Sequence, residues 1–125
     1  MSVQKAIRTL KKYQGIVEQA TEEELANAAA RADRFRMFNC PHTGVGLAAL
    51  RKLVEKKVVR SHERVVVLST ANGLKFADQK AAYHMGSLDG IKPSYRNMPV
   101  NLPADAAQVA RAIARHVDRA RLLVS

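Results

Sequence analysis

The stretch that decides the fold is Arg64-Val65-Val66-Val67-Leu68-Ser69, which lies near the middle of a chain of 125 residues. β-Branched residues favour extended backbone, and this run is apolar on both of its faces. A strand buried on both faces is typical of the centre of a parallel sheet that helices cover. The sequence therefore predicts a strand over residues 64–69, and residues 16–20 predict a second, shorter one.

Helical patterns flank both segments. Apolar residues at helical spacing predict a helix over residues 3–13, which Gly15 ends. Thr21 followed by Glu24 forms a capping box at the start of the next helix, and Pro41 suits the first turn of a helix that reaches about residue 57. Further helices are expected over residues 76–85 and from about 104 to 122. Strands alternating with helices predict a three-layer α/β fold, in which a partial parallel sheet is flanked by helices.

A polar loop follows the predicted central strand and carries the candidate site. Open α/β sheets bind ligands just beyond the carboxyl ends of their parallel strands, which is where Thr70 stands. Ser69 is a second hydroxyl there, and since neighbouring strand residues face opposite sides, only one of the two is expected to face a ligand. Gly73 is expected to allow a positive backbone torsion. The alternative is that Thr70 only caps the turn.

The charge balance of the chain allows two explanations. The formal net charge is +10, which favours nucleic acid or another anionic partner. Either the chain is an incomplete part of a larger protein that supplies acidic residues, or it is a small basic module that binds nucleic acid or protein. Arg111, Arg115 and Arg119 form a stripe that could contact phosphates, with Arg121 nearby. No aromatic stacking platform accompanies these basic residues, so nucleic acid is not favoured.

Composition also argues against several other classes. No apolar run approaches the ~18 residues of a membrane span, and the first ten residues lack the apolar block of a signal peptide. The single cysteine, Cys40, excludes an internal disulfide, and an intracellular compartment fits it best. Cys40 and His42 lack the spacing of a nucleophile pair, so a buried, inert thiol is expected. The histidines lack ligand spacing, and no metal site is expected.

Two long motifs carry a family resemblance. The first is Met37-Phe38-Asn39-Cys40-Pro41-His42-Thr43-Gly44-Val45-Gly46-Leu47-Ala48-Ala49-Leu50, and the second is Val65-Val66-Val67-Leu68-Ser69-Thr70-Ala71-Asn72-Gly73-Leu74-Lys75-Phe76. In this order they resemble the C-terminal region of the threonine synthase family, which are pyridoxal-phosphate (PLP) enzymes of fold type II, similar to the tryptophan synthase β-subunit. Residues 23–33 agree with the same family. The resemblance covers nearly the whole of residues 1–125 and fades after Tyr83 and His84.

The resemblance implies a function and a cofactor. The family converts O-phospho-L-homoserine and water into L-threonine and phosphate with pyridoxal 5'-phosphate, and Thr70 matches its hydroxyl that hydrogen-bonds the pyridine nitrogen. Ser69 and Gly73 are expected beside it. The family's Schiff-base lysine and glycine-rich phosphate loop lie N-terminal to the matched region, and Lys75 is not that lysine. No catalytic residue is therefore assigned, and the chain alone is expected to be inactive.

The same resemblance sets expectations for partners and location. The sequence departs from the family pattern at three places. A homodimer is one expected arrangement, and no association with a membrane is expected. The expected location is the cytoplasm, or the plastid stroma if the protein comes from a plant. Asn72 stands where a histidine is common in the family, which puts any role of that histidine in doubt. Gly46 replaces a usual alanine, and residues 35–36 replace a turn that commonly contains glycine.

Overall fold

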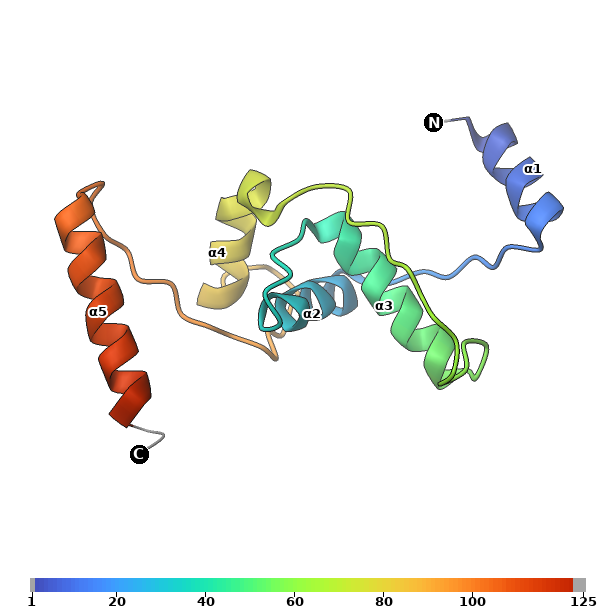
Figure 1. Ribbon diagram of the computed structural model, residues 1–125. Coiled ribbons are helices and arrows are strands. Elements are labelled where there is room, and N and C mark those ends of the chain that lie inside the picture. The colour runs from blue at the N-terminus through green and yellow to red at the C-terminus, as the bar shows by residue number, and fades with distance from the viewer. Residues whose placement is uncertain (1, 123–125) are drawn as a thin grey trace.

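The computed structural model describes residues 2–122, with side chains described as far as residue 118, and this part of the chain is helical (Figure 1). Its elements in chain order are α1 (Val3–Tyr13), α2 (Glu22–Asp33), α3 (Pro41–Glu55), the 3-10 helix η1 (Gly73–Phe76), α4 (Ala77–Met85) and α5 (Ala106–Leu122). The side chains of Arg119 and Arg121, which belong to the basic stripe, lie outside the described part.

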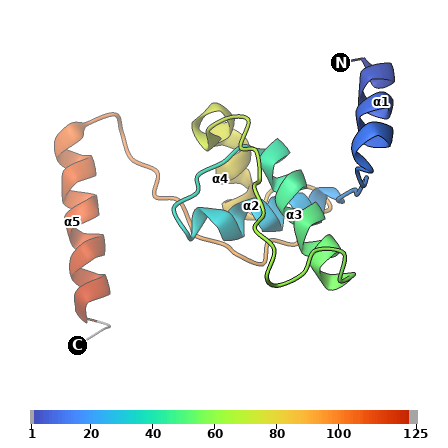
Figure 2. The same cartoon turned by 45° about the vertical axis from the view of Figure 1, so that its right-hand side comes forward.

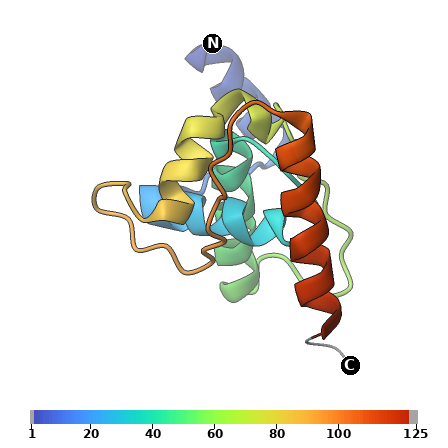
Figure 3. The same cartoon turned by 90° about the vertical axis from the view of Figure 1, so that its left-hand side faces the viewer.

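Helices α2, α3 and α4 form the centre of the molecule, and α1 and α5 lie at its two ends (Figures 1 and 2). Seen from the side on which α5 lies, this helix stands to one side of the central helices (Figure 3). Helix α1 has no buried residue, and the exposed fraction of Ile113 on α5 is 60%. The apolar faces of the two terminal helices are therefore not covered by the described residues.

The packing of α2 against α3 makes most of the core. Thr21 caps α2 as expected, because its hydroxyl accepts from the Glu24 amide at 3.2 Å and the Glu24 carboxylate accepts from the Thr21 amide at 2.8 Å. Gly44 lets the helices approach closely, since a Cβ atom there would lie 2.5 Å from the carbonyl oxygen of Leu25. The buried apolar residues are Leu25, Ala29, Ala30, Ala32, Cys40, Ala48 and Tyr83.

Polar contacts attach α4 and the loop after it to α2. The Lys80 ammonium lies 2.9 and 2.6 Å from the two oxygens of Asp33. The Tyr83 hydroxyl donates to Asn27 Oδ1 at 2.6 Å, and the Ser94 amide donates to the same oxygen at 2.8 Å. The Tyr95 amide donates to the Tyr83 hydroxyl at 3.1 Å. These bonds hold residues 94–95 against the central helices.

The expected parallel sheet is not found in residues 2–122. Residues 64–70 and 16–20 are drawn out without helix or turn (Figure 1), but neither segment forms a ladder. A strand needs a neighbour to pair its backbone groups. The side chains of Val66 and Leu68 are 87% and 82% exposed, whereas the sequence predicts a strand covered on both faces. The three-layer α/β arrangement is therefore not observed here, although the helices that would flank such a sheet are present.

The helix boundaries agree closely with those expected from sequence. Helix α1 has the predicted bounds, and it ends where Gln14 takes a left-handed conformation with φ 51°. Helix α3 ends two residues before the predicted position, at Glu55, and Lys57 after it has φ 58°. Within residues 2–122, no helix is both long enough and apolar enough to cross a membrane.

Candidate functional site

Two distant segments meet at the end of the extended run 64–70. The amide of Cys40 donates to the carbonyl of Ala71 at 3.1 Å, and the amide of Gly73 donates to the carbonyl of Phe38 at 3.0 Å. Asn39 and Asn72 form an isolated antiparallel bridge between these two bonds. This short pairing fixes the loop that follows residue 70 against the start of α3.

A cluster of three hydroxyls and one thiol lies at this junction. Cys40 Sγ is 3.3 Å from Thr43 Oγ1 and 3.4 Å from Thr70 Oγ1. Thr43 Oγ1 in turn lies 3.4 Å from Ser69 Oγ. Cys40 and Thr43, at the start of α3, are buried, whereas Ser69 and Thr70 are exposed residues at the end of the extended run. The arrangement presents two hydroxyls to the outside and supports them from behind.

Ser69 and Thr70 contact the same cluster through different partners. The hydroxyls of both residues reach the same cluster, one through Thr43 and the other through Cys40. The chain bends at Ala71, directly after the pair. The expectation that only one of the two hydroxyls faces a ligand stays a prediction.

Gly73 has a different use from the predicted one. The glycines with positive φ in the described residues are Gly86 and Gly90, so Gly73 does not need a left-handed backbone. A Cβ atom at Gly73 would lie 2.9 Å from two ring carbons of Phe38 and 3.1 Å from the carbonyl of Asn39. Gly73 therefore allows the close approach of residues 38–40 to the loop. Asn72 begins η1, because its Oδ1 accepts from the Leu74 amide at 2.9 Å.

Cys40 is a residue whose part in this site the sequence reasoning missed. Its side chain is fully buried, as expected, but its sulfur contacts Thr70. Burial acts to raise the pKa of the thiol; hydrogen bonds from the hydroxyls of Thr43 and Thr70 and from the amides of Thr43 and Ala71 outweigh it and lower the pKa from 9.0 to about 6. The only available signal was that Cys40 and Thr43 belong to the same motif at the start of a helix.

Asn39, next to Cys40, has an unsatisfied acceptor. Its Nδ2 donates to the Met37 carbonyl at 2.6 Å, but its Oδ1 is buried and receives no hydrogen bond from the described residues. A buried polar atom without a partner costs about 1–3 kcal/mol. The described residues alone therefore do not satisfy the hydrogen-bonding capacity of Asn39 Oδ1.

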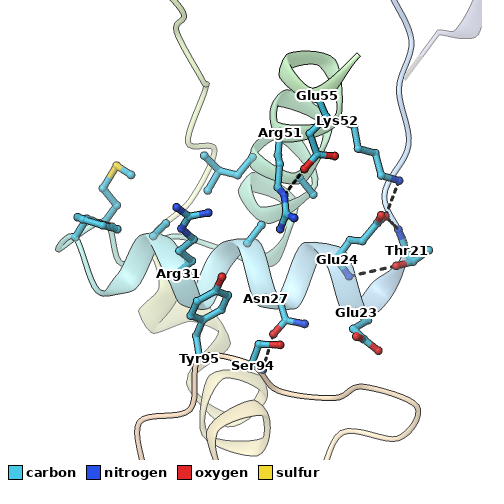
Figure 4. A pocket seen from close by; sticks show the side chains of 16 residues that line it. Thr21, Glu23, Glu24, Asn27, Arg31, Arg51, Lys52, Glu55, Ser94 and Tyr95 are labelled. Carbon is cyan, nitrogen blue, oxygen red and sulfur yellow. Dashed lines mark hydrogen bonds and ion pairs between the residues drawn. The ribbon is translucent and has the colours of Figure 1, made fainter. Parts of the chain in front are cut away.

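A larger cavity lies elsewhere, between α2, α3 and residues 94–95, with a volume of about 600 Å³ (Figure 4). Three cations line it, Arg31, Arg51 and Lys52. Lys52 lies 2.6 Å from Glu24, and Arg51 lies 2.8 Å from Glu55. None of Ser69, Thr70 and Gly73 lines this cavity. The sequence-predicted site is thus not in this cavity but at an exposed surface.

The described residues hold no group of three or more His, Cys, Asp or Glu side chains that could bind a metal ion. The candidate site is composed of hydroxyls, a thiol and backbone amides, which are hydrogen-bonding groups. Such a set suits a neutral heteroatom or an aromatic ring nitrogen better than a divalent cation, which prefers carboxylate, imidazole or thiolate ligands.

Comparison with known proteins gives a specific similarity. No protein-family model matches the chain. The chain is 47% identical over 109 residues to "Threonine synthase 2, chloroplastic" of Arabidopsis thaliana, and this match covers 87% of the chain. It covers 21% of the Arabidopsis protein, so the chain spans about a fifth of the length of this relative.

Proposed function

Since the chain is threonine synthase-like over 87% of its length, we propose that it forms one wall of the PLP site of such an enzyme. The observation that carries the proposal is the exposed hydroxyl pair of Ser69 and Thr70, held from behind by Cys40 and Thr43. The similarity does not favour the alternative of a small basic module that binds nucleic acid or protein.

The residues present fit one part of the cofactor. A hydroxyl can donate to or accept from the pyridine nitrogen of PLP, and two of them are exposed side by side. Gly73 keeps the loop beside them close to residues 38–40, because any side chain there would strike the Phe38 ring. We assign this edge of the cofactor ring to Thr70, Ser69 and Gly73.

Each of these residues has a task that does not require it to react. PLP, when bound, supplies the electron sink of the reaction, and the protein supplies binding and orientation. A hydroxyl fixes the position of the ring nitrogen without the negative charge of a carboxylate, so it does not by itself hold a proton on that nitrogen. Cys40 and Thr43 hold the two hydroxyls in place.

The remaining parts of the reaction are proposed to come from other polypeptide. The Schiff-base lysine, the phosphate loop and the groups that bind O-phospho-L-homoserine have no matching motif in this sequence. Homodimer formation, and a location in the cytoplasm or in a plant's plastid stroma, stay predictions.

The same proposal explains the exposed extended run. Val66 and Leu68 are large apolar side chains that water reaches almost completely, and the backbone of residues 64–70 pairs with no neighbouring strand in the described residues. We propose that residues 64–69 pair with strands of that other polypeptide. The helices of this chain and the joint sheet would then make the three-layer α/β domain of fold type II.

A chimera tests the proposed function. The region of Arabidopsis threonine synthase 2 that matches this chain is replaced by the corresponding residues of this chain, and phosphate release from O-phospho-L-homoserine is measured. The account predicts PLP-dependent release of phosphate and formation of threonine. The Lys75→Gln chimera is the matched control, because Lys75 lies in η1, close to the site, but has no assigned task.

Two results would contradict the proposal. One is a folded chimera that binds no PLP while the parent Arabidopsis protein does. The other is loss of PLP binding in the Lys75→Gln chimera, since that would give Lys75 the part that the proposal assigns to a lysine of the other polypeptide.

A further inference from the structure

The ring of Phe38 lies against the loop that follows the extended run. Two backbone hydrogen bonds pair residues 38–40 with residues 71–73. The ring covers Gly73 closely, since a Cβ atom there would lie 2.9 Å from two of its carbons. A displacement of the ring would therefore leave the loop without the surface that it packs on.

Lys80 on α4 contacts the same ring. Its Nζ lies 4.9 Å from the centroid of Phe38, within the ~6 Å at which a cation is attracted to the face of an aromatic ring. The same Nζ lies 2.9 and 2.6 Å from the two oxygens of Asp33. The ion pair with α2 thus fixes the ammonium beside the Phe38 ring.

The surroundings of the ring make this contact important for its position. The exposed fraction of Phe38 is 40%, so part of the ring faces water and packing covers only the rest. The side chain of Lys80 is 11% exposed, and a shielded cation attracts an aromatic face more strongly than one in water. The ammonium therefore adds a constraint that burial of the ring does not supply.

We propose that Lys80 and Phe38 are positioning residues of the candidate site. Lys80 holds the Phe38 ring against Gly73, and the ring sets the place of residues 69–73, which present the two hydroxyls. Neither side chain is assigned a contact with a ligand. This step rests on the proposed function only for what the hydroxyls bind, because the contacts themselves involve no cofactor.

Cys40 reports the place of the loop in the full chain without any cofactor. Its sulfur lies 3.4 Å from Thr70 Oγ1, and the Thr70 hydroxyl and the Ala71 amide are among the groups that lower its pKa. Cys40 is the sole cysteine, so ¹³Cβ-labelled cysteine gives one NMR signal whose pH titration reports this pKa. A loop that moves away from the sulfur raises the pKa towards its ordinary value.

Two changes remove the proposed support, and one keeps it. Phe38→Leu removes the ring without changing any charge, and it should lower the dissociation constant of the Cys40 thiol about tenfold, which is about one pH unit. The double variant Asp33→Asn with Lys80→Gln removes the cation together with its carboxylate, so the net charge is kept, and it should raise the pKa in the same direction. Phe38→Tyr keeps a ring face for Lys80 and should titrate like wild type.

Tyr83→Phe is the matched control on α4. It removes the hydroxyl that donates to Asn27 and accepts from the Tyr95 amide, so it loosens the packing of α4 on α2 and leaves the Lys80 contacts in place. The unfolding midpoint should fall, but the Cys40 titration should stay within a few tenths of a pH unit of wild type. Helical circular dichroism checks the fold of each variant.

The comparison of these variants decides the matter. A Cys40 pKa that does not rise in Phe38→Leu, or in the double variant, would mean that the ring or the cation does not set the place of the loop. A rise of equal size in Tyr83→Phe would mean that any loosening of α4 displaces the loop. Each of these results overturns the inference.

The outcome is independent of PLP binding, because no cofactor is present in this experiment. A chimera that fails to bind PLP would contradict the proposed function and leave the positioning of the loop by Phe38 and Lys80 standing.

Discussion

The sulfur of Cys40 lies 3.4 Å from the hydroxyl oxygen of Thr70, although the two residues are thirty positions apart. The contact joins the start of α3 to the end of the extended run 64–70. It gives the buried thiol a task in presenting an exposed hydroxyl. It also makes the ionisation of Cys40 depend on the folded structure.

The first prediction is that the stability of the chain depends on pH through Cys40. Its pKa is about 6 in the folded chain and 9.0 without the fold, so between these values the unfolded chain binds more protons. The free energy of unfolding should therefore rise as pH increases from 6 towards 9, and this contribution should be lost as pH falls through about 6. At about 1.36 kcal/mol per unit, the change is on the order of a few kcal/mol.

Urea unfolding at several pH values measures this effect, with Cys40→Ser as the control that has no thiol to ionise. Burial lowers the pKa of His84, and this group loses its contribution as pH falls below its ordinary value of 6.5. The difference between wild type and Cys40→Ser cancels that contribution. A difference that stays constant between pH 6 and 9 would contradict the assigned ionisation.

The second prediction concerns the close approach of α2 and α3. Gly44→Ala should destabilise the chain by about 1–3 kcal/mol, because its Cβ would lie 2.5 Å from a backbone oxygen that cannot move freely. Gly46→Ala is the matched control on the same helix. Its Cβ would lie 3.4 Å from Val67 Cγ1, and the gain in helix propensity is up to about 1 kcal/mol. Thermal unfolding that shows equal losses for both variants would contradict the packing described.

The third prediction concerns the ion pair between α2 and α4. The side chains of Lys80 and Asp33 are only 11% and 13% exposed. Lys80→Met should therefore cost about 1–3 kcal/mol, because it leaves the part-buried Asp33 carboxylate without a partner.

Two further variants check that reasoning by chemical unfolding. The double variant Asp33→Leu with Lys80→Met should recover most of the loss, since neither charge is then left unpaired. Arg51→Gln breaks the exposed pair with Glu55, whose side chains are 68% and 58% exposed, and should cost less than about 1 kcal/mol. A double variant as unstable as Lys80→Met alone would count against the ion pair.

The helices could be predicted from the sequence, whereas the site could be predicted only in part. Helix signals are local: the capping box of Thr21 and Glu24 and the apolar spacing of residues 3–13 each lie within a few turns. The value of Thr70 as a candidate also came from its local place after the extended run. The contact of Cys40 with Thr70 spans thirty residues and follows no period, so no pattern in the sequence indicates it.

The sheet was predicted from strand-like composition, which describes each strand by itself and not its pairing with a neighbour. Residues 64–69 have the composition of a strand, and they form neither helix nor turn. Pairing depends on a neighbouring strand, and the described residues supply none for this run. Gly73 shows a similar limit, because the sequence marks a position that needs glycine but does not say whether backbone torsion or a neighbouring ring requires it.

The fourth prediction tests the proposed insertion of residues 64–69 into a sheet. The side chain of Val66 is 87% exposed in this chain, so Val66→Lys should leave its unfolding midpoint nearly unchanged and lower its tendency to self-associate. In the chimera, the same change would bury an unpaired charge and should prevent folding. Sedimentation and circular dichroism of both proteins measure this. A chimera that tolerates Val66→Lys would contradict the insertion.

The central claim is that the hydroxyls of Ser69 and Thr70 contact the ring of PLP. It is tested most directly by the visible absorbance of PLP bound to the chimera, compared with the variant that carries both Ser69→Ala and Thr70→Val. The account predicts that the double variant folds but binds PLP at least about tenfold more weakly, with a shifted absorbance maximum, since two hydrogen-bonding groups are lost. Identical affinity and an identical spectrum in the two proteins would contradict it.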